Sequence, residues 1–197
     1  MSDLPDKIRA FVALRMSAEV EDSIARWIES LRGDRDGIRW VRTANLHLTL
    51  RFLGGAVDRN LIAPLDHALE QIAAGTAPFT LEARGAGVFP NLDRPRVVWV
   101  GLAGDALPRL AAQVEAAAVR CGFPREPRPY SPHLTIGRVR DLRGWPPIRD
   151  VLREASSREF GATPIARMML YRSILGKTAS QYVELAGYQF TATSEPT

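Results

Sequence analysis

The pattern His-x-Thr followed by an apolar residue occurs twice in this chain, as HLTL from His47 and as HLTI from His133. The chain has 197 residues and only three histidines, so two of the three lie in these copies. Polar and apolar residues alternate in each copy, which is the period of a half-buried strand. His47 and Thr49 then point to one face of the first strand, and His133 and Thr135 to one face of the second. The sequence predicts two equivalent strands, each presenting an imidazole and a hydroxyl.

The third histidine, His67, is an internal comparison for the other two. It lies in the helical stretch LDHA and has no matched partner, so we interpret it as a surface residue of a helix. A single His-x-Thr on a strand carries little functional information, whereas two copies with matched flanks are poorly explained by chance. Two histidines presented alike can supply one general base and one general acid at neutral pH. His47 and His133 are therefore the candidate catalytic residues.

The periodicity of the remaining segments predicts a mixture of helices, strands and hairpins, which indicates the α+β class rather than a doubly wound parallel sheet. Besides the two motif strands, we expect strands at 9–14, 79–88, 95–102, 165–175 and 181–190, and helices after Ser17 and at 60–74, 105–121 and 146–154. The halves of the chain resemble each other, because each has a helix followed by a His-x-Thr strand.

This internal similarity predicts a bilobal, duplicated fold. Two antiparallel or mixed sheets are expected to surround a central groove, with the helices on the outside. Residues 1–190 are expected to form a single two-lobed domain, and residues 191–197 a disordered tail.

Composition excludes several classes of protein. Cys121 is the single cysteine, so there is no intramolecular disulfide and no cysteine-based zinc site. No apolar run approaches the roughly 20 residues that span a bilayer. The N-terminal sequence MSDLPD lacks the basic-then-apolar order of a signal peptide. We therefore expect a protein of the reducing cytoplasm that does not associate with membranes.

Positive charge is concentrated around the second motif. Eight arginines and three carboxylates lie between Arg120 and Arg153, although the net charge of the whole chain is only +4. Of the 26 basic residues 24 are arginine, which a GC-rich genome would also produce. Arginine binds phosphate in a bidentate manner, so the stretch predicts a basic face for a nucleic acid. A merely solvated face is the alternative.

The two motifs together suit chemistry at one phosphate. If the two strands face each other across a cleft, the hydroxyls of Thr49 and Thr135 can donate to phosphate oxygens from both sides. One histidine would deprotonate the attacking hydroxyl or water, and the other would protonate the leaving oxygen. Hydroxyls and arginine, rather than a metal ion, would meet the charge on the phosphorus oxygens. The sequence thus predicts acid–base phosphodiester chemistry without a metal.

With these motifs and their flanks, the chain resembles the 2H phosphoesterase superfamily, and within it the RNA 2′,3′-cyclic phosphodiesterases of bacteria and archaea, also called 2′-5′ RNA ligases. The resemblance covers about residues 8–190. It rests on the segments RAFVA at 9–13, RWV at 39–41, NLHLTLRFLG at 45–54, GAGVFP at 85–90, PRVVW at 95–99 and YSPHLTIGR at 130–138.

The resemblance implies a metal-independent and cofactor-independent hydrolase that opens 2′,3′-cyclic phosphate ends to 2′-phosphomonoesters. It also implies the reverse reaction, in which a cyclic phosphate end is joined to a 5′-hydroxyl. The expected partners are single-stranded or tRNA-like RNA with cyclic phosphate ends and cyclic nucleotides, bound by a monomer. Carried over to this chain, His47 protonates the departing O3′, His133 activates water, Thr49 and Thr135 hold the phosphate, and Arg138 matches the second-motif arginine. Pseudo-symmetry permits the two histidines to exchange roles.

Arg138 and two further residues are candidates for substrate binding. Strand alternation puts Arg138 on the face opposite His133, so it needs a β-bulge or the strand end to reach the phosphate; a surface salt bridge is the alternative. Arg51 has the same strand parity as Thr49 and is predicted to extend the same face. Tyr130 is predicted either to stack on a base or to pack in the core.

Other functions predict different residues. A zinc or di-metal hydrolase needs three or four ligands, and the chain has no HExxH or DxH spacing. A phosphohistidine enzyme of the phospholipase D type would have lysine two residues after each histidine, where Thr49 and Thr135 stand. The remaining alternatives are a phosphodiesterase for small 2′-5′ linked or cyclic nucleotides, and a non-catalytic RNA-binding protein that keeps the groove.

Overall fold

The computed structural model describes residues 5–34, 36–176 and 180–193. Within these ranges the chain forms four α-helices: α1 (Ala18–Leu31), α2 (Ile62–Ala74), α3 (Leu107–Arg120) and α4 (Trp145–Glu154). The strands in the same ranges are β1 (Lys7–Leu14), β2 (Ile38–Trp40), β3 (Leu48–Asp58), β4 (Phe79–Phe89), β5 (Val97–Ala103), β6 (His133–Val139), β7 (Glu159–Ile165), β8 (Arg167–Leu175) and β9 (Ser180–Gln189).

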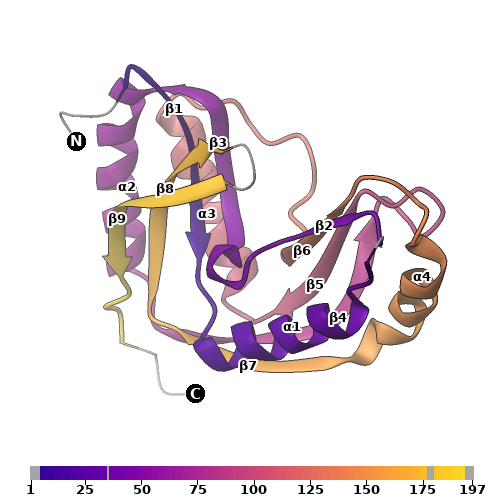
Figure 1. The fold of residues 1–197 in the computed structure, drawn as a ribbon. Helices are drawn as coiled ribbons and strands as arrows, with labels where there is room; N and C mark the ends of the chain where they lie inside the picture. Colours follow the sequence, from indigo (N-terminus) through magenta and orange to yellow (C-terminus); the bar gives the residue numbers. More distant parts are fainter. Residues whose placement is uncertain (1–4, 35, 177–179, 194–197) are drawn as a thin grey trace.

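The strands form one antiparallel sheet in the order β7-β4-β5-β6-β3-β1-β8-β9, with β2 also paired to β6 (Figure 1). We call β3, β1, β8 and β9 the first lobe, and β6, β5, β4 and β7 the second lobe. The lobes meet where β3 pairs with β6, at Leu48 and Leu134. The predicted α+β class and the two lobes are confirmed, and hydrogen bonding between β3 and β6 joins the two expected sheets into one.

The helices cover one face of this sheet. α2 and α3 pack on the first lobe, and α1 and α4 pack on the second (Figure 1). The lobes exchange elements, because α1 follows β1 of the first lobe but packs on the second, while α3 follows β5 of the second lobe but packs on the first. The strand β4 likewise leaves the first half of the chain to pair with β5.

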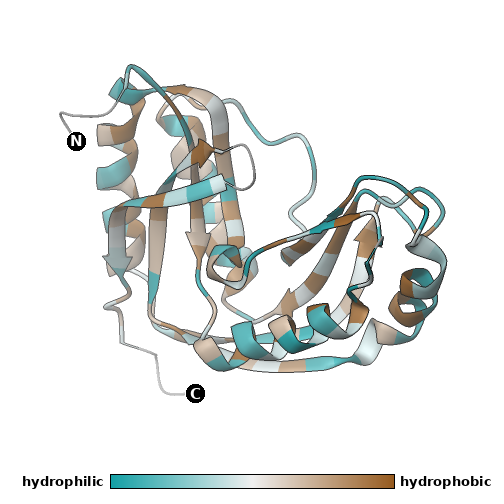
Figure 2. Cartoon of the chain, viewed as in Figure 1, coloured by the Kyte–Doolittle hydropathy of each residue, from teal (hydrophilic) through white to brown (hydrophobic). Residues whose placement is uncertain are grey.

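The main hydrophobic core lies between the helices and the sheet. Strand residues alternate between this core and the opposite face, and hydrophobic residues recur at intervals along the strands and helices in Figure 2. The helix α1 contributes Val20, Ile24 and Trp27 to the core, and the side chain of Ser17 accepts a hydrogen bond from the amide of Val20, as its predicted capping role requires. The other face of the sheet carries no helix among the described residues, and we call it the open face.

The predicted secondary structure lacks one strand. The strand β7 was missed because its sequence EFGATPI contains Gly161 and Pro164, which are rare inside strands. It is tolerated at the edge of the sheet, where it pairs only with β4. The expected tail from residue 191 is partly ordered, since the amides of Thr191 and Ala192 donate to carbonyls at the end of α2 and just beyond it, at 3.4 and 3.2 Å. Residues 194–197 of that expected tail lie outside the described residues.

Candidate active site

The two His-x-Thr motifs come together at the junction of the lobes. Leu48 pairs with Leu134, and these are the residues directly after the two histidines. In an antiparallel pair this register places His47 next to Thr135 and Thr49 next to His133. The two imidazoles are also close enough to interact electrostatically, because the charge of His133 contributes to lowering the pKa of His47. The site therefore contains two identical pairs of imidazole and hydroxyl, related by pseudo-twofold symmetry.

Both imidazole rings are held in the same way. Nδ1 of His47 donates to the carbonyl oxygen of Asn45 at 2.7 Å, and Nδ1 of His133 donates to the carbonyl oxygen of Ser131 at 2.7 Å. A carbonyl only accepts hydrogen bonds, so Nδ1 carries the proton and Nε2 of each neutral ring has a free lone pair. The side chain of Asn45 in turn donates to the carbonyl of Ser180 at 2.9 Å, which ties the first motif to β9.

The two threonine hydroxyls are available to a ligand. Thr49 and Thr135 are both half-buried, and neither hydroxyl has a hydrogen-bond partner among the residues that the structure describes. A half-buried hydroxyl without a protein partner is ready to donate to an anion. Phosphate binding by both threonines stays a prediction.

Arg138 reaches the open face because β6 contains a β-bulge. The strand β6 advances two residues where β5 advances one, at the pairs Trp99↔Thr135 and Val98↔Gly137, so Ile136 is the extra residue. The bulge turns Arg138 to the side of His133 and Thr135. Arg138 is exposed, has no carboxylate partner within the described ranges, and its charge contributes to lowering the pKa of His47. Arg138 is therefore a free cation beside the paired motifs.

The prediction for Arg51 is wrong, and a second bulge is the reason. At the pairs Ala13↔Thr49 and Val12↔Arg51, β3 advances two residues where β1 advances one, so Leu50 is the extra residue. Arg51 consequently turns toward α3, where its side chain is only 6% exposed. It forms an ion pair with Glu115 and donates to the carbonyl of Pro124. Arg51 therefore fixes the loop that leads to the second motif and does not line the open face.

Aromatic rings surround both histidines. The ring of Phe11 lies 4.8 Å from that of His47, and Tyr182 meets His47 edge-on at 5.0 Å. In the second lobe, Phe89 meets His133 edge-on at 5.1 Å. Burial raises the pKa of the Tyr182 hydroxyl, so this group stays protonated near the site. These rings pack against the two imidazoles and form part of the environment of the two motifs.

Tyr130 lies in the loop between α3 and β6, three residues before His133. It is 39% exposed, which makes core packing the weaker of its two expected roles. Its hydroxyl has no hydrogen-bond partner in the part of the chain that the structure describes. Stacking of Tyr130 on a base stays a prediction.

Part of the basic stretch from Arg120 to Arg153 is paired with carboxylates. Four of its eight arginines pair with acidic neighbours: Arg128 with Glu126, Arg143 with Asp141, and Arg149 and Arg153 with Asp150. The stretch holds only three carboxylates, so it keeps an excess of positive charge, and a basic face for a nucleic acid stays a prediction. Arg138 is the arginine of this stretch whose charge reaches His47.

Burial lowers the pKa of His47 to about 4, and the positive charges of Arg15, His133 and Arg138 act in the same direction. The unfolded chain has a histidine pKa near 6.5, so between about pH 6.5 and about pH 4 the unfolded state binds a proton that the native state does not. The free energy of unfolding is therefore expected to fall as pH falls through this window. Urea unfolding near pH 7 and pH 4.5 measures the effect.

The variant His47→Asn should lose part of this pH dependence, because it removes the group that titrates. His67→Ala is the matched control, since the side chain of His67 is 74% exposed on α2. An unchanged pH dependence in His47→Asn would contradict the neutral, buried state of His47.

Within the described ranges, no three His, Cys, Asp or Glu side chains gather in a way that could hold a metal ion. Across the same residues, none of the helices has the length and apolar character needed to cross a membrane.

A duplicated α+β fold with one His-x-Thr from each lobe at a shared centre is the architecture of a 2H phosphoesterase. A sequence profile described as LigT like phosphoesterase matches the chain twice, at residues 14–99 and 100–178, with one motif in each match. The chain belongs to the LigT-like phosphoesterase family, which makes it an enzyme of that type.

Relatives span nearly the whole chain. A protein of Methanothermobacter thermautotrophicus is 31% identical over 180 residues, which cover 91% of this chain and 97% of that protein. One of Aeropyrum pernix is 35% identical over 173 residues, covering 87% and 96%. Both relatives are named RNA 2′,3′-cyclic phosphodiesterase.

Solved structures of the same fold agree with this assignment. A crystal structure of a Thermus thermophilus protein superposes with a TM-score of 0.81 at 26% identity, covering 95% of this chain and 100% of that chain. E. coli LigT complexed with 3′-AMP has a TM-score of 0.74 at 28% identity, covering 94% of this chain and 99% of that chain.

Proposed function

We propose that this protein hydrolyses the 2′,3′-cyclic phosphate ends of RNA, and 2′,3′-cyclic nucleotides, to 2′-phosphomonoesters by metal-independent catalysis with two histidines. The observation that carries the proposal is the matched anchoring of His47 and His133, which leaves Nε2 of each ring free beside an unpartnered threonine hydroxyl. The names of the relatives support the substrate class, and the 3′-AMP complex of E. coli LigT supports nucleotide binding by this fold.

The phosphate is proposed to lie between the two motifs. Thr49 and Thr135 donate to its two non-bridging oxygens, one from each lobe. Arg138 balances the negative charge, which grows on these oxygens as phosphorus becomes five-coordinate. Donors that are already in place need no rearrangement during the reaction, so they stabilise the transition state more than water could.

The proton transfers are assigned to the histidines. His133 takes a proton from a water molecule, the water oxygen attacks phosphorus, and the bond between phosphorus and O3′ breaks. His47 gives a proton to O3′, so the products are a 2′-phosphate and a 3′-hydroxyl. In the ligation reaction, the 5′-hydroxyl of a second RNA takes the place of the water and attacks phosphorus. The bond between phosphorus and O3′ breaks as before, so the products are a 2′-5′ linkage and a 3′-hydroxyl.

The state of His47 adds a condition to this assignment. With a pKa of about 4, its ring is neutral in the free protein at pH 7, and only about one molecule in a thousand carries the proton. A phosphate anion against Nε2 favours the charged ring. We propose that His47 takes up its proton together with the substrate. Without the substrate, His47 is in the protonation state of a general base, which is the role that it would have if the two histidines exchanged roles.

The reaction is tested with 2′,3′-cyclic AMP in the presence of EDTA. We expect hydrolysis to 2′-AMP. EDTA should not lower the rate, because the proposed mechanism assigns every role to a protein side chain and none to a metal ion. Chromatography that resolves 2′-AMP from 3′-AMP measures the outcome. Loss of activity in EDTA, or formation of 3′-AMP alone, would exclude the proposed mechanism.

A further inference from the structure

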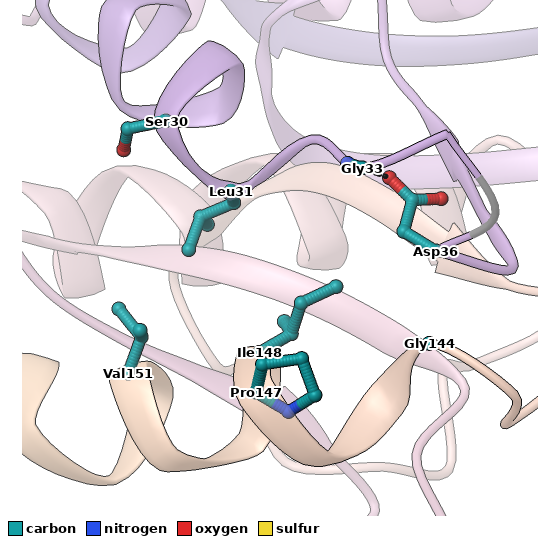
Figure 3. A pocket seen from close by; sticks show the side chains of 8 residues that line it. All are labelled: Ser30, Leu31, Gly33, Asp36, Gly144, Pro147, Ile148 and Val151. Atoms are coloured by element: carbon teal, nitrogen blue, oxygen red, sulfur yellow. Dashed lines mark hydrogen bonds between the residues drawn. The ribbon is translucent and has the colours of Figure 1, made fainter.

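Two cavities among the described residues lie on opposite sides of the sheet. One, of about 290 Å³, lies between the end of α1 and the start of α4 in the helix layer of the second lobe, where Leu31, Ile148 and Val151 line it (Figure 3). The other, of about 360 Å³, is lined by residues of β8 and β9 together with Arg15. The second cavity has chemistry that the proposed reaction has not used.

The second cavity lies on the same face of the sheet as the catalytic motifs. Met169, which lines it, pairs with Ala13, and Ala13 pairs with Thr49. Met169 is thus two strands from the first motif, a lateral distance of about 10 Å. Arg15 connects the two regions, because it lines the cavity and its charge also acts on His47.

The lining of the cavity combines apolar surface with one polar pair. Arg167 of β8 and Glu184 of β9 form an ion pair, and each side chain is 43% exposed, so each keeps free hydrogen-bonding capacity. Gly187 makes room for this pair, since a Cβ there would lie 2.7 Å from Nη2 of Arg167 and 2.9 Å from Oε1 of Glu184. Met169 and Tyr171 supply the apolar part.

This lining suits a nucleobase better than a phosphate. Both arginines already have carboxylate partners, since Arg15 pairs with Glu21 at 2.6 Å and Arg167 pairs with Glu184. The cavity therefore offers little unbalanced positive charge to an anion. A base has an apolar ring and an edge that carries both hydrogen-bond donors and acceptors. The adjacent guanidinium of Arg167 can donate to such an edge, and the carboxylate of Glu184 can accept from it.

We propose that this cavity binds the base of the nucleotide that precedes the cyclic phosphate in an RNA strand. The inference rests on the proposed function. The cyclic phosphate is fused to the terminal ribose, so this ribose stays beside the histidines. The cavity lies two strands away, where the preceding nucleotide of the strand can reach it. Single nucleotides leave the cavity empty, so the cavity makes the enzyme prefer RNA ends to free cyclic nucleotides.

The test compares two substrates, 2′,3′-cyclic AMP and the dinucleotide ApA that ends in a 2′,3′-cyclic phosphate. Two variants alter the cavity: Arg167→Ala combined with Glu184→Ala removes the polar pair, and Gly187→Val displaces it. Glu29→Ala combined with Arg32→Ala is the matched control, because this exposed pair lies at the C-terminal end of α1 and its ion-pair distance is 3.2 Å. We measure kcat and KM separately for each substrate.

Both cavity variants are expected to lower kcat/KM for the dinucleotide about tenfold, mainly through KM, which is the size of one base contact. The value for 2′,3′-cyclic AMP should stay within about twofold, and the control should change neither. Equal losses on both substrates, or no loss on the dinucleotide, would overturn the proposal.

A separate binding measurement keeps this inference distinct from the proposed function. If the wild-type protein hydrolyses neither substrate, the proposed function fails. The cavity is then tested by calorimetric titration with ApA carrying a 2′-phosphate and with 2′-AMP. Weaker binding of the dinucleotide alone in the cavity variants supports the subsite, and equal weakening of both ligands rejects it.

Discussion

Replacing either His47 or His133 by alanine is expected to lower kcat/KM for 2′,3′-cyclic AMP by roughly 10²–10⁴, the usual contribution of a general acid or base. Both rings are anchored through Nδ1 to a backbone carbonyl, so each leaves Nε2 for the proton transfer that we propose. Because the proposed mechanism uses both histidines in the same step, the double variant should lose little more than the more damaging single variant. Steady-state kinetics at neutral pH measures all three.

The third histidine provides the matched control for these variants. His67→Ala removes an imidazole from the exposed face of α2, where its nearest charged partner is Glu70 at 3.8 Å, and it should leave kcat/KM unchanged. Circular dichroism of each variant separates a catalytic loss from a loss of structure. A near-normal rate in either His47→Ala or His133→Ala would remove that histidine from the mechanism.

The second large effect concerns stability. Arg51→Met is expected to lower the free energy of unfolding by about 3 kcal/mol, because it leaves the partly buried carboxylate of Glu115 without its cation. It also removes the donor to the carbonyl of Pro124, which holds the loop before the second motif. Urea denaturation of the wild type and the variant measures the change.

Adding Glu115→Gln to Arg51→Met should recover part of the lost stability, since it removes the uncompensated charge and keeps an acceptor for the amide of Glu126, now bonded at 2.9 Å. Below the unfolding transition, the activity of Arg51→Met should fall far less than that of the histidine variants. Unchanged stability together with a large loss of activity would show that Arg51 acts on the substrate, as its strand parity first suggested.

Strand parity predicted correctly which residues of the two motifs share a face, but it failed where the strands are irregular. His47 and Thr49, and His133 and Thr135, precede the bulges, so simple alternation describes them correctly. Beyond Leu50 and Ile136 the alternation is reversed by one extra residue in each strand. A bulge depends on how the neighbouring strand pairs, which is a property of the tertiary fold. From the sequence we could infer that Arg138 needs a bulge to reach the phosphate. We could not predict the second bulge, at Leu50, which turns Arg51 away from the open face.

Other parts of the site depend on contacts between segments that are far apart in the chain. The carbonyls of Asn45 and Ser131 hold the histidines, and any residue could supply a backbone carbonyl, so the residue types contain no signal. Tyr182 reaches His47 because β9, which is far from the first motif in the chain, pairs with β8 in the first lobe. The neutral state of His47 likewise follows from burial among these segments. Resemblance to a family suggested the chemistry, and the packing determines the state of the groups that we propose for it.

The exchange of elements between the lobes limits what half of this chain could do alone. A segment that ends after β4 would hold β1 and β3 of one lobe, but its own β4 and α1 belong to the other. Such a half could complete its core only by lending these elements to a second copy. Two such halves that exchanged these elements would bring two identical His-x-Thr motifs together on a twofold axis. In the full chain the two motifs have different neighbours, because Tyr182 contacts His47 while Phe89 contacts His133.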